Sequence, residues 1–212
     1  MQPMQHIASK FTTIPGLMSA PDPSGELGFP ADTGASVDTA DLVIVPAVTY
    51  HQHRACNALV RRMYLSRGYR VLPSRQSLDD PNHFTLGAWL DGELVATLTG
   101  SRDSRGGLLA DKLYSHEISA LRKPTRVIGE VTRLAVDSEF GNPELLKSLF
   151  RATYQYARAI FGVTDVVVEV NPRHASYYRR ELGFSQVGDL RTCPRVEAPA
   201  VLLHRTMGSL RF

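Results

Sequence analysis

Two segments in the second half of the chain each place a strand-forming run before a helix with a strong start signal. Residues 127–136 (VIGEVTRLAV) and 165–170 (DVVVEV) are rich in β-branched and apolar residues. Each run is followed by an Asn-Pro pair, at 142–143 and 171–172, in which asparagine suits the N-cap and proline suits the first helical position. Successive strand–helix units of this kind build neighbouring parallel strands with helices packed on the sheet.

The first half of the chain carries the signals of antiparallel strands. Residues 84–90 and 93–99 flank Asp91-Gly92, and this dipeptide between two apolar runs is a strong hairpin signal. Pro46 restricts the run at 42–48 to a sheet edge, because proline donates no ladder hydrogen bond. The other expected elements are a helix over 52–67 ending at Gly68, a short amphipathic helix within 100–125, helices from Asn142 to Gly162 and from Asn171 to Gly183, and strands at 184–188 and 200–207. This order predicts a mixed α/β sheet with helices on both faces.

Composition limits the class of protein and the number of domains. The chain is 43% hydrophobic and 21% charged, which is typical of a globular protein whose core needs no disulfide or metal. Residues 1–40 are rich in Pro, Gly, Ser, Ala and Asp without periodicity, so they predict a flexible arm before one folded domain over 41–212. Cys56 and Cys193 lie far apart and form no C-x-x-C motif, which indicates a reduced, cytoplasmic protein.

Several classes of partner are not indicated by the sequence. No run approaches 18 apolar residues, so no transmembrane segment is expected. The net charge of +3 is mild and no basic block is interleaved with aromatic residues, so nucleic acid is not an expected partner. His51 and His53 have no further carboxylate or cysteine at ligand spacing, so no metal site is expected.

Three local strings resemble one branch of the GNAT acyltransferases. The string at 129–136 (GEVTRLAV) is similar to the central strand of the branch that comprises the acyl-homoserine-lactone (autoinducer) synthases and the long-chain N-acyl amino acid synthases. Residues 171–184 (NPRHASYYRRELGF) resemble the helix after the fifth GNAT strand. Residues 108–122 (LLADKLYSHEISALR) resemble the N-acyl amino acid synthases more closely than the autoinducer synthases. The resemblance implies a GNAT fold over 42–207 and a bacterial, amide-forming acyltransferase.

The resemblance also implies that Glu130 and Arg133, on the central strand, are the catalytic residues. An amino acid is mostly ammonium at neutral pH, so its amine must lose a proton, and Glu130 is the candidate base. The alternative is a buried ion pair of Glu130 with Arg133 or Arg126, because a lone buried carboxylate is costly. Arg133 either binds the acceptor carboxylate or organises the loop between strands. In a regular strand the two residues face opposite sides, and a β-bulge, which GNAT central strands carry here, re-aims them.

Further expected contacts with substrate lie along the same strand and on the helix after residue 171. The expected substrate-binding residues are Leu134, Ala135, Val136, His174 and Tyr178. For the last two, the alternative is the ordinary role of a helix residue at the surface or in packing.

The segment 137–147 (DSEFGNPELLK) bears on the identity of the acyl donor. Coenzyme-A-dependent GNAT enzymes usually carry a Gly-rich turn here, whose backbone N–H groups hold the pyrophosphate. This segment has one glycine, and Asp137 and Glu139 would repel a pyrophosphate. The expected donor is therefore the acyl-phosphopantetheine of an acyl carrier protein rather than acyl-CoA, with no tightly bound cofactor. The basic residues expected to dock the acidic carrier, unless they form an ordinary solvated face, are Lys147, Arg151, Arg158, Arg179 and Arg180.

The leading functional prediction is transfer of a long-chain fatty acyl group from acyl carrier protein to the α-amine of an amino acid. One alternative is an autoinducer synthase that uses S-adenosylmethionine and closes a lactone. The others are a coenzyme-A-dependent acetyltransferase of small amines and a non-catalytic GNAT-like binding module. The sequence leaves open the acyl chain length, the acceptor and the oligomeric state.

Overall fold

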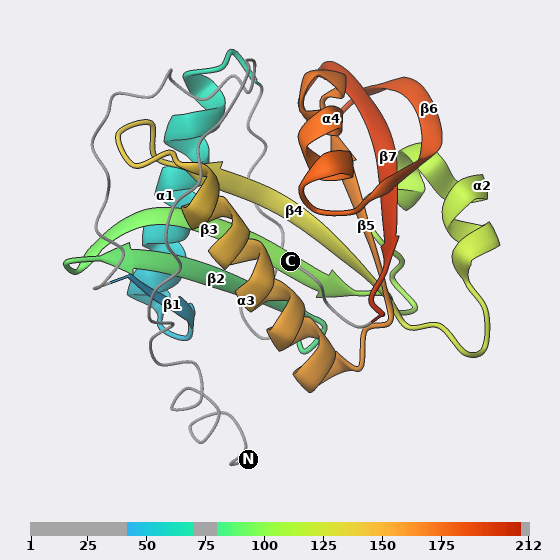
Figure 1. Cartoon of the computed structure of the whole chain (residues 1–212), viewed down its shortest axis with the longest axis horizontal. Helices are drawn as coiled ribbons and strands as arrows, with labels where there is room; N and C mark the ends of the chain where they lie inside the picture. The colour runs from blue at the N-terminus through green and yellow to red at the C-terminus, as the bar shows by residue number, and fades with distance from the viewer. Residues whose placement is uncertain (1–41, 70–79, 209–212) are drawn as a thin grey trace.

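Strands and helices follow one another along the chain in the predicted order (Figure 1). The structure, a computed structural model, describes residues 42–69 and 80–208, so the arm predicted for residues 1–40 lies outside the described residues. The elements are β1 (Val43–Pro46), α1 (Tyr50–Leu65), β2 (His83–Leu90), β3 (Glu93–Arg102), α2 (Asp111–Leu121), β4 (Ile128–Val136), α3 (Pro143–Phe161), β5 (Asp165–Val170), α4 (Pro172–Arg180), β6 (Ser185–Cys193) and β7 (Ala198–Thr206).

All seven of these strands form one mixed sheet in the order β1-β2-β3-β4-β5-β7-β6. Only β4 and β5 are parallel neighbours, as the strand–helix units predict, and β1 with its proline is an edge strand. Helices α3 and α4 cover one face, where their apolar residues join the largest core cluster, and α1 and α2 cover the other (Figure 1). The predicted mixed α/β sheet with helices on both faces is confirmed.

Local chemistry explains where the elements begin and end. Asp91 and Gly92 both have positive φ (50° and 80°), as the tight two-residue turn between β2 and β3 requires. Asn142 accepts the N–H of Leu145 at 2.7 Å and so caps α3. Three predicted boundaries are wrong. Helix α1 starts at Tyr50 because Thr49 and Gln52 form a capping box, α4 ends at Arg180, three residues before Gly183, and β6 continues to Cys193 because residues 191–193 pair with β7.

The central strand β4 carries a bulge and then separates from β5. Thr132 pairs with Thr99 of β3, and Ala135 pairs with Thr97. Between these two pairs β4 advances by three residues and β3 by two, so β4 contains one extra residue. Arg133 lies in this bulge with a φ of 55°, a left-handed conformation that is uncommon for arginine. Within the described residues, pairing between β4 and β5 covers only 128–131 and 165–168. The predicted β-bulge is confirmed, and beyond it the two strands diverge (Figure 1).

Candidate active site

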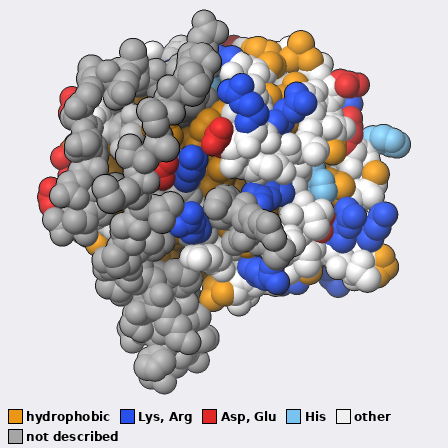
Figure 2. Space-filling model, in the orientation of Figure 1, with side chains coloured by type: hydrophobic (Ala, Val, Ile, Leu, Met, Phe, Trp, Pro, Cys, Tyr) orange, Lys and Arg blue, Asp and Glu red, His pale blue; other side chains and the backbone are white. Residues whose placement is uncertain are grey.

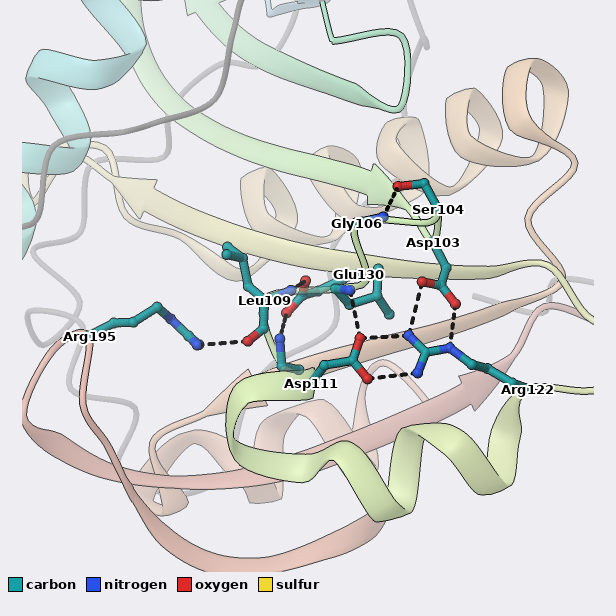
Figure 3. A network of polar contacts seen from close by, with 10 residues as sticks. Asp103, Ser104, Gly106, Leu109, Asp111, Arg122, Glu130 and Arg195 are labelled. Atoms are coloured by element: carbon teal, nitrogen blue, oxygen red, sulfur yellow. Dashed lines mark hydrogen bonds and ion pairs between the residues drawn. The ribbon is translucent and has the colours of Figure 1, made fainter.

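Glu130, the one carboxylate on β4, is deeply buried, with 2% of its surface exposed. Its two oxygens accept backbone N–H groups from the loop before α2, Oε2 from Leu109 at 2.7 Å and Oε1 from Ala110 at 2.9 Å (Figure 3). Burial raises the pKa of Glu130 to about 7, and the nearby negative charge of Glu169 adds to the rise. The two hydrogen bonds and the positive charge of Arg195 oppose the rise without cancelling it. A carboxylate with such a pKa changes charge near neutral pH.

The ion-pair interpretation of Glu130 is wrong. Arg126 lies 3.5 Å from Asp165 at the start of β5, and Arg133 donates from Nη2 to Asn57 on α1 at 2.5 Å. Backbone N–H groups therefore replace a cationic side chain as the direct partners of Glu130. This arrangement leaves Glu130 able to take up a proton without breaking a salt bridge.

A clamp of charged side chains holds the loop that contacts Glu130 (Figure 3). Asp111 accepts the N–H of Leu108 at 2.7 Å, and Arg122 at the end of α2 binds the same carboxylate at 2.6 and 2.8 Å. Arg122 also binds Asp103 at 2.7 and 3.0 Å. Residues at both ends of segment 108–122 therefore fix the backbone N–H groups that donate to Glu130. This is the segment whose sequence resembles the N-acyl amino acid synthases.

The bulge directs Arg133 to the face of the sheet that Glu130 also faces. Arg133 is half-buried beside Tyr64 and Cys56 of α1, and burial lowers its pKa. Glu130 lies two residues after Ile128, which packs with α2 on that same face. The structure therefore brings the two predicted catalytic residues to one side of β4, where α1 and α2 meet the strand.

His174 and Tyr178 lie on α4 next to the end of α1. Arg173 donates to His174 Nε2 at 3.1 Å and to the hydroxyl of Tyr69 at 2.9 Å. Burial, together with the charges of Arg173 and Arg67, lowers the pKa of His174 to about 4, so its ring is neutral at neutral pH. Tyr178 is buried, packs edge-on against Phe150 with ring centroids 5.5 Å apart, and has a pKa raised by burial. The ends of α1 and α4 therefore meet where β4 and β5 diverge.

The predicted substrate contacts on β4, Leu134, Ala135 and Val136, have side chains that pack in or against the core. Ala135 packs with Leu59, Val60 and Met63 of α1, while Val136 joins the core on the α3 side and Leu134 is half-buried against it. The backbone of Ala135 and Val136 pairs with β3 on one edge. Their side chains belong to the core, so the part of this segment available to a ligand is the backbone edge that faces β5.

An apolar cavity lies between the sheet and α3. Gly100, Gly129 and Glu130 line it on the sheet side. Its other walls include the apolar side chains of Phe84, Phe150, Ala157, Val163, Phe184 and Met207. The backbone of Glu130 lines this cavity, because its neighbours Gly129 and Val131 face α3 while the Glu130 carboxylate faces the loop before α2 on the other side of the sheet.

The predicted carrier-docking residues do not form one uniform surface. Lys147 lies 3.5 Å from both Glu144 and Glu181, so two carboxylates offset its charge. Arg158 donates to the carbonyl of Met207 at 3.1 Å, three turns of α3 from Lys147 and away from the diverging strand ends. Arg151 is half-buried on α3, and Arg179 and Arg180 are exposed at the end of α4. Figure 2 shows several Lys and Arg side chains on the face of the molecule that carries α3 and α4.

Sequence reasoning missed Glu169, Arg195 and Thr132, which the structure places beside Glu130. Arg195 pairs with Glu169 through Nη2 and donates from Nη1 to the carbonyl of Leu109 at 3.0 Å (Figure 3). Glu169 is the one carboxylate inside the run VVVEV, and that isolated charge is a signal that could have found it. Nothing in the sequence marks Arg195, which lies in the turn between β6 and β7.

Neither a metal site nor a membrane-spanning helix is found among the described residues. Within residues 42–69 and 80–208, no group of three or more His, Cys, Asp or Glu side chains is placed to hold a metal ion. None of the helices described is both long and apolar enough to cross a membrane.

Comparison with known proteins identifies relatives of this site and fold. The sequence model of the N-acyl amino acid synthase FeeM family matches residues 55–206. The structure of FeeM, an N-acyl amino acid synthase from uncultured soil microbes, is 27% identical, with a TM-score of 0.73 over 78% of this chain and 92% of that chain. The AHL synthase LasI is 14% identical (TM-score 0.57, 79% and 89% covered), and an acetyltransferase of the GNAT family from Streptococcus pneumoniae is 17% identical (TM-score 0.56, 78% and 99% covered). A comparison with curated protein sequences gave no match.

These matches differ in what they show. At 14% and 17% identity, LasI and the streptococcal acetyltransferase share the fold, which confirms the predicted GNAT architecture. The family match at 55–206 spans more than half of the chain and includes most of α1, the central strand and the helix that carries His174. The chain therefore belongs to the FeeM family of N-acyl amino acid synthases, and it is an amide-forming acyltransferase.

Proposed function

We propose that this enzyme transfers a fatty acyl group from the phosphopantetheine thioester of an acyl carrier protein to the α-amine of an amino acid. The observation that supports this most is the position of Glu130. It is a buried carboxylate with a pKa of about 7, on the strand that diverges from β5 and whose opposite face lines an apolar cavity. A base, an open strand edge and an apolar slot are the three things that amide formation from a fatty thioester needs.

Each predicted catalytic and substrate-binding residue has a role in this proposal. Glu130 takes a proton from the amine, and Arg133 binds the acceptor carboxylate with its planar guanidinium. The backbone edge of residues 134–136 pairs with the extended pantetheine arm, as a strand edge pairs with an added strand. His174, which is neutral, and Tyr178 close the site at the ends of α4 and α1.

The chemical step is a substitution at the thioester carbonyl. The ammonium group of the acceptor gives one proton to the Glu130 carboxylate, and the free amine attacks the carbonyl carbon to form the C–N bond. The tetrahedral intermediate then loses its second amine proton, the C–S bond breaks, and the leaving thiolate takes up that proton. Glu130 releases its own proton to solvent before the next turnover, so the products are an amide, a free carrier thiol and one proton.

The start of α3 supports a carrier protein over coenzyme A as the donor. Pro143 has no N–H, the N–H of Leu145 is taken by Asn142, and the N–H groups of Glu139 and Phe140 are taken by Asp137. These are the groups that would hold a pyrophosphate at a helix N-terminus. Asp137 and Glu139 add negative charge to the same turn.

The surface around the diverging strand ends supports docking of an acidic carrier. We assign the docking role to Arg151, Arg179 and Arg180, with Lys147 a weaker member because Glu144 and Glu181 offset its charge. Arg158 lies too far along α3 to take part in the same contact. An electrostatic contact of this kind weakens with salt over a screening length of about 10 Å at 0.1 M.

A donor comparison tests the proposal. Initial rates are measured with dodecanoyl carrier protein and with dodecanoyl-CoA, and the specificity constant for the carrier protein is expected to be at least 100-fold higher. The double variant Arg151→Glu, Arg179→Glu should lower it about tenfold for the carrier protein and leave that for the coenzyme A thioester unchanged. The double variant Arg105→Glu, Lys123→Glu, exposed at the other end of β4, is the matched control. Equal specificity constants for the two donors would reject the carrier protein as donor.

A further inference from the structure

Two buried polar atoms without hydrogen-bond partners flank the point where β4 and β5 diverge. Val131 and Val168 are the last paired residues, so Thr132 and Glu169 are the first residue of each strand beyond the pairing. Thr132 Oγ1 and Glu169 Oε1 are both buried, and among the described residues neither has a hydrogen-bond partner. Buried polar atoms are almost always hydrogen-bonded, so two unpaired oxygens at this point indicate a site for a ligand that donates hydrogen bonds.

The Glu169 side chain is held in place with one oxygen left open. Its side chain is 8% exposed, its Oε2 pairs with Arg195, and the buried thiol of Cys193 lies beside the same carboxylate. Arg195 is held in turn by the carbonyl of Leu109, whose N–H donates to Glu130. Arg195 and Leu109 therefore link the two glutamates, and Oε1 of Glu169 is held beside Glu130.

Strand alternation places the polar atoms on one face. Thr132 lies two residues after Glu130 and before the bulge, so both face the α1 and α2 side. Glu169 lies two residues after Val167, which packs with α2 on that side. Arg133 is turned to the same side by its positive φ. The arrangement presents a carboxylate oxygen and a hydroxyl near Glu130, with a guanidinium one residue along β4.

We propose that Glu169 Oε1 and Thr132 Oγ1 bind the α-ammonium group of the acceptor amino acid and hold it beside Glu130. This inference rests on the proposed function. An ammonium group has three N–H donors and a positive charge, and here it meets a carboxylate oxygen, a hydroxyl oxygen and the Glu130 carboxylate. Arg133 receives the carboxylate of the same zwitterion. Glu169 binds the charged amine and so selects it, and Glu130 remains the base.

The test separates the ammonium group from the rest of the acceptor. The best acceptor among the twenty protein amino acids is varied in steady-state assays, and its deamino carboxylic acid is used as a competitive inhibitor. Glu169→Gln should raise the KM of the amino acid at least tenfold. The KM of the acyl carrier protein and the inhibition constant of the deamino acid should change less than twofold. Glu117→Gln is the matched control, because it also removes a carboxylate that pairs with an arginine, Arg191.

A pH profile gives a second readout. The charged groups facing Glu130 are Glu169 from β5 and Arg195 from the turn before β7, while the loop before α2 contributes backbone N–H groups and Tyr64 of α1 lies near Arg195. Removing the negative charge of Glu169 removes one cause of the raised pKa of Glu130. The acidic limb of kcat/KM should therefore move to lower pH in Glu169→Gln.

Three outcomes would overturn the inference. Equal rises in the amino acid KM and the deamino-acid inhibition constant, or an unchanged KM in a folded Glu169→Gln variant, would assign Glu169 to structure alone. If Glu169→Gln does not fold, Thr132→Val decides: its amino acid KM should rise about threefold while Thr132→Ser stays near wild type, and a wild-type KM in Thr132→Val rejects the site. A wild-type enzyme that makes no amide from any amino acid instead rejects the proposed function itself.

Discussion

At Glu130, burial and hydrogen bonding act on one carboxylate in opposite directions. Burial disfavours the charged form, while the N–H groups of Leu109 and Ala110 favour it. The balance sets its pKa to about 7, which suits a base that must be ionised before it takes a proton at neutral pH. An acid with a much lower pKa would be a weaker base, and one with a much higher pKa would stay protonated.

The first prediction is that Glu130→Gln lowers kcat strongly with a limited effect on stability. Loss of a general base typically lowers the rate 10²–10⁴-fold. Both oxygens of Glu130 accept N–H groups, and the glutamine amide nitrogen cannot accept, so one N–H loses its partner at a cost of about 1–3 kcal/mol. Removal of a costly buried charge offsets part of that cost. Single-turnover rates and urea unfolding measure the two effects.

A control and a contradicting result accompany this prediction. Glu93→Gln changes an exposed carboxylate at the start of β3 and should leave both quantities unchanged. A Glu130→Gln enzyme that retains wild-type kcat but loses several kcal/mol of stability would assign Glu130 to holding the loop before α2.

The second prediction concerns pH and the stability of the fold. The pKa of Glu130 is about 7 in the folded protein against an ordinary 4.5, so its contribution to stability is fully present below pH 4.5 and is lost as pH rises through 7. The loss is about 3 kcal/mol in total. Unfolding free energies of wild type and Glu130→Gln are compared at several pH values from 5 to 8. Their difference should shift in favour of the variant as pH rises, and a pH-independent difference would contradict the raised pKa.

At the scale of elements, α2 acts on the site through its two ends. The loop just before its first residue supplies the N–H groups of Leu109 and Ala110 to Glu130, and Arg122, just after its last residue, binds Asp103 and Asp111. For Asp111, burial would raise the pKa, but hydrogen bonds from Arg122 and the Leu108 N–H outweigh it and lower the pKa. The helix is thus tied to the loop that it must position.

The third prediction follows from this clamp. Arg122→Met should free the loop over 108–111 and lower kcat about tenfold, while the partly exposed ion pairs account for only about 1 kcal/mol of stability. The KM of the acyl donor should stay unchanged, because the diverging ends of β4 and β5 are intact. Lys123→Met, the exposed neighbour, is the control. A variant that is less stable but turns over normally would show that the clamp does not position Glu130.

The fourth prediction concerns the cavity under α3. Ala157 lines the cavity, so Ala157→Leu should fill part of it and favour shorter acyl chains. We expect the ratio of kcat/KM for dodecanoyl over hexanoyl donor to fall at least tenfold. Ala159→Leu, on the exposed side of the same helix, should leave the ratio unchanged. An unchanged ratio in a folded Ala157→Leu variant would place the acyl chain elsewhere.

The helices and strands could be predicted because they depend on contacts between residues close in sequence. The active site could be predicted only in part, because it depends on contacts between residues far apart in sequence. Asp91-Gly92 and the two Asn-Pro pairs act within a few residues, and the hairpin and helix starts that they predict are confirmed. Arg195 reaches Glu169 and Leu109 from far along the chain, and no local pattern encodes such a contact. The partners of Glu130 were missed because they are backbone groups, which every residue carries.

At the scale of the whole molecule, divergence of β4 and β5 joins the two faces of the sheet. The apolar cavity lies on the α3 face, and Glu130 and Arg133 lie on the α1 and α2 face. We propose that the acyl donor enters from the first face and the amino acid from the second, so that they meet at the diverging strands. The division into an arm over 1–40 and a catalytic domain over 41–212 stays a prediction.

Mass spectrometry of the product tests the proposed acyl transfer from carrier protein to amino acid most directly. The purified full chain is incubated with dodecanoyl carrier protein and an equimolar mixture of the twenty protein amino acids. We expect an N-dodecanoyl amino acid that appears in equal amount with free carrier thiol and is lost in Glu130→Gln. Free dodecanoate without an amide, or an acyl lactone formed only when S-adenosylmethionine is added, would contradict it.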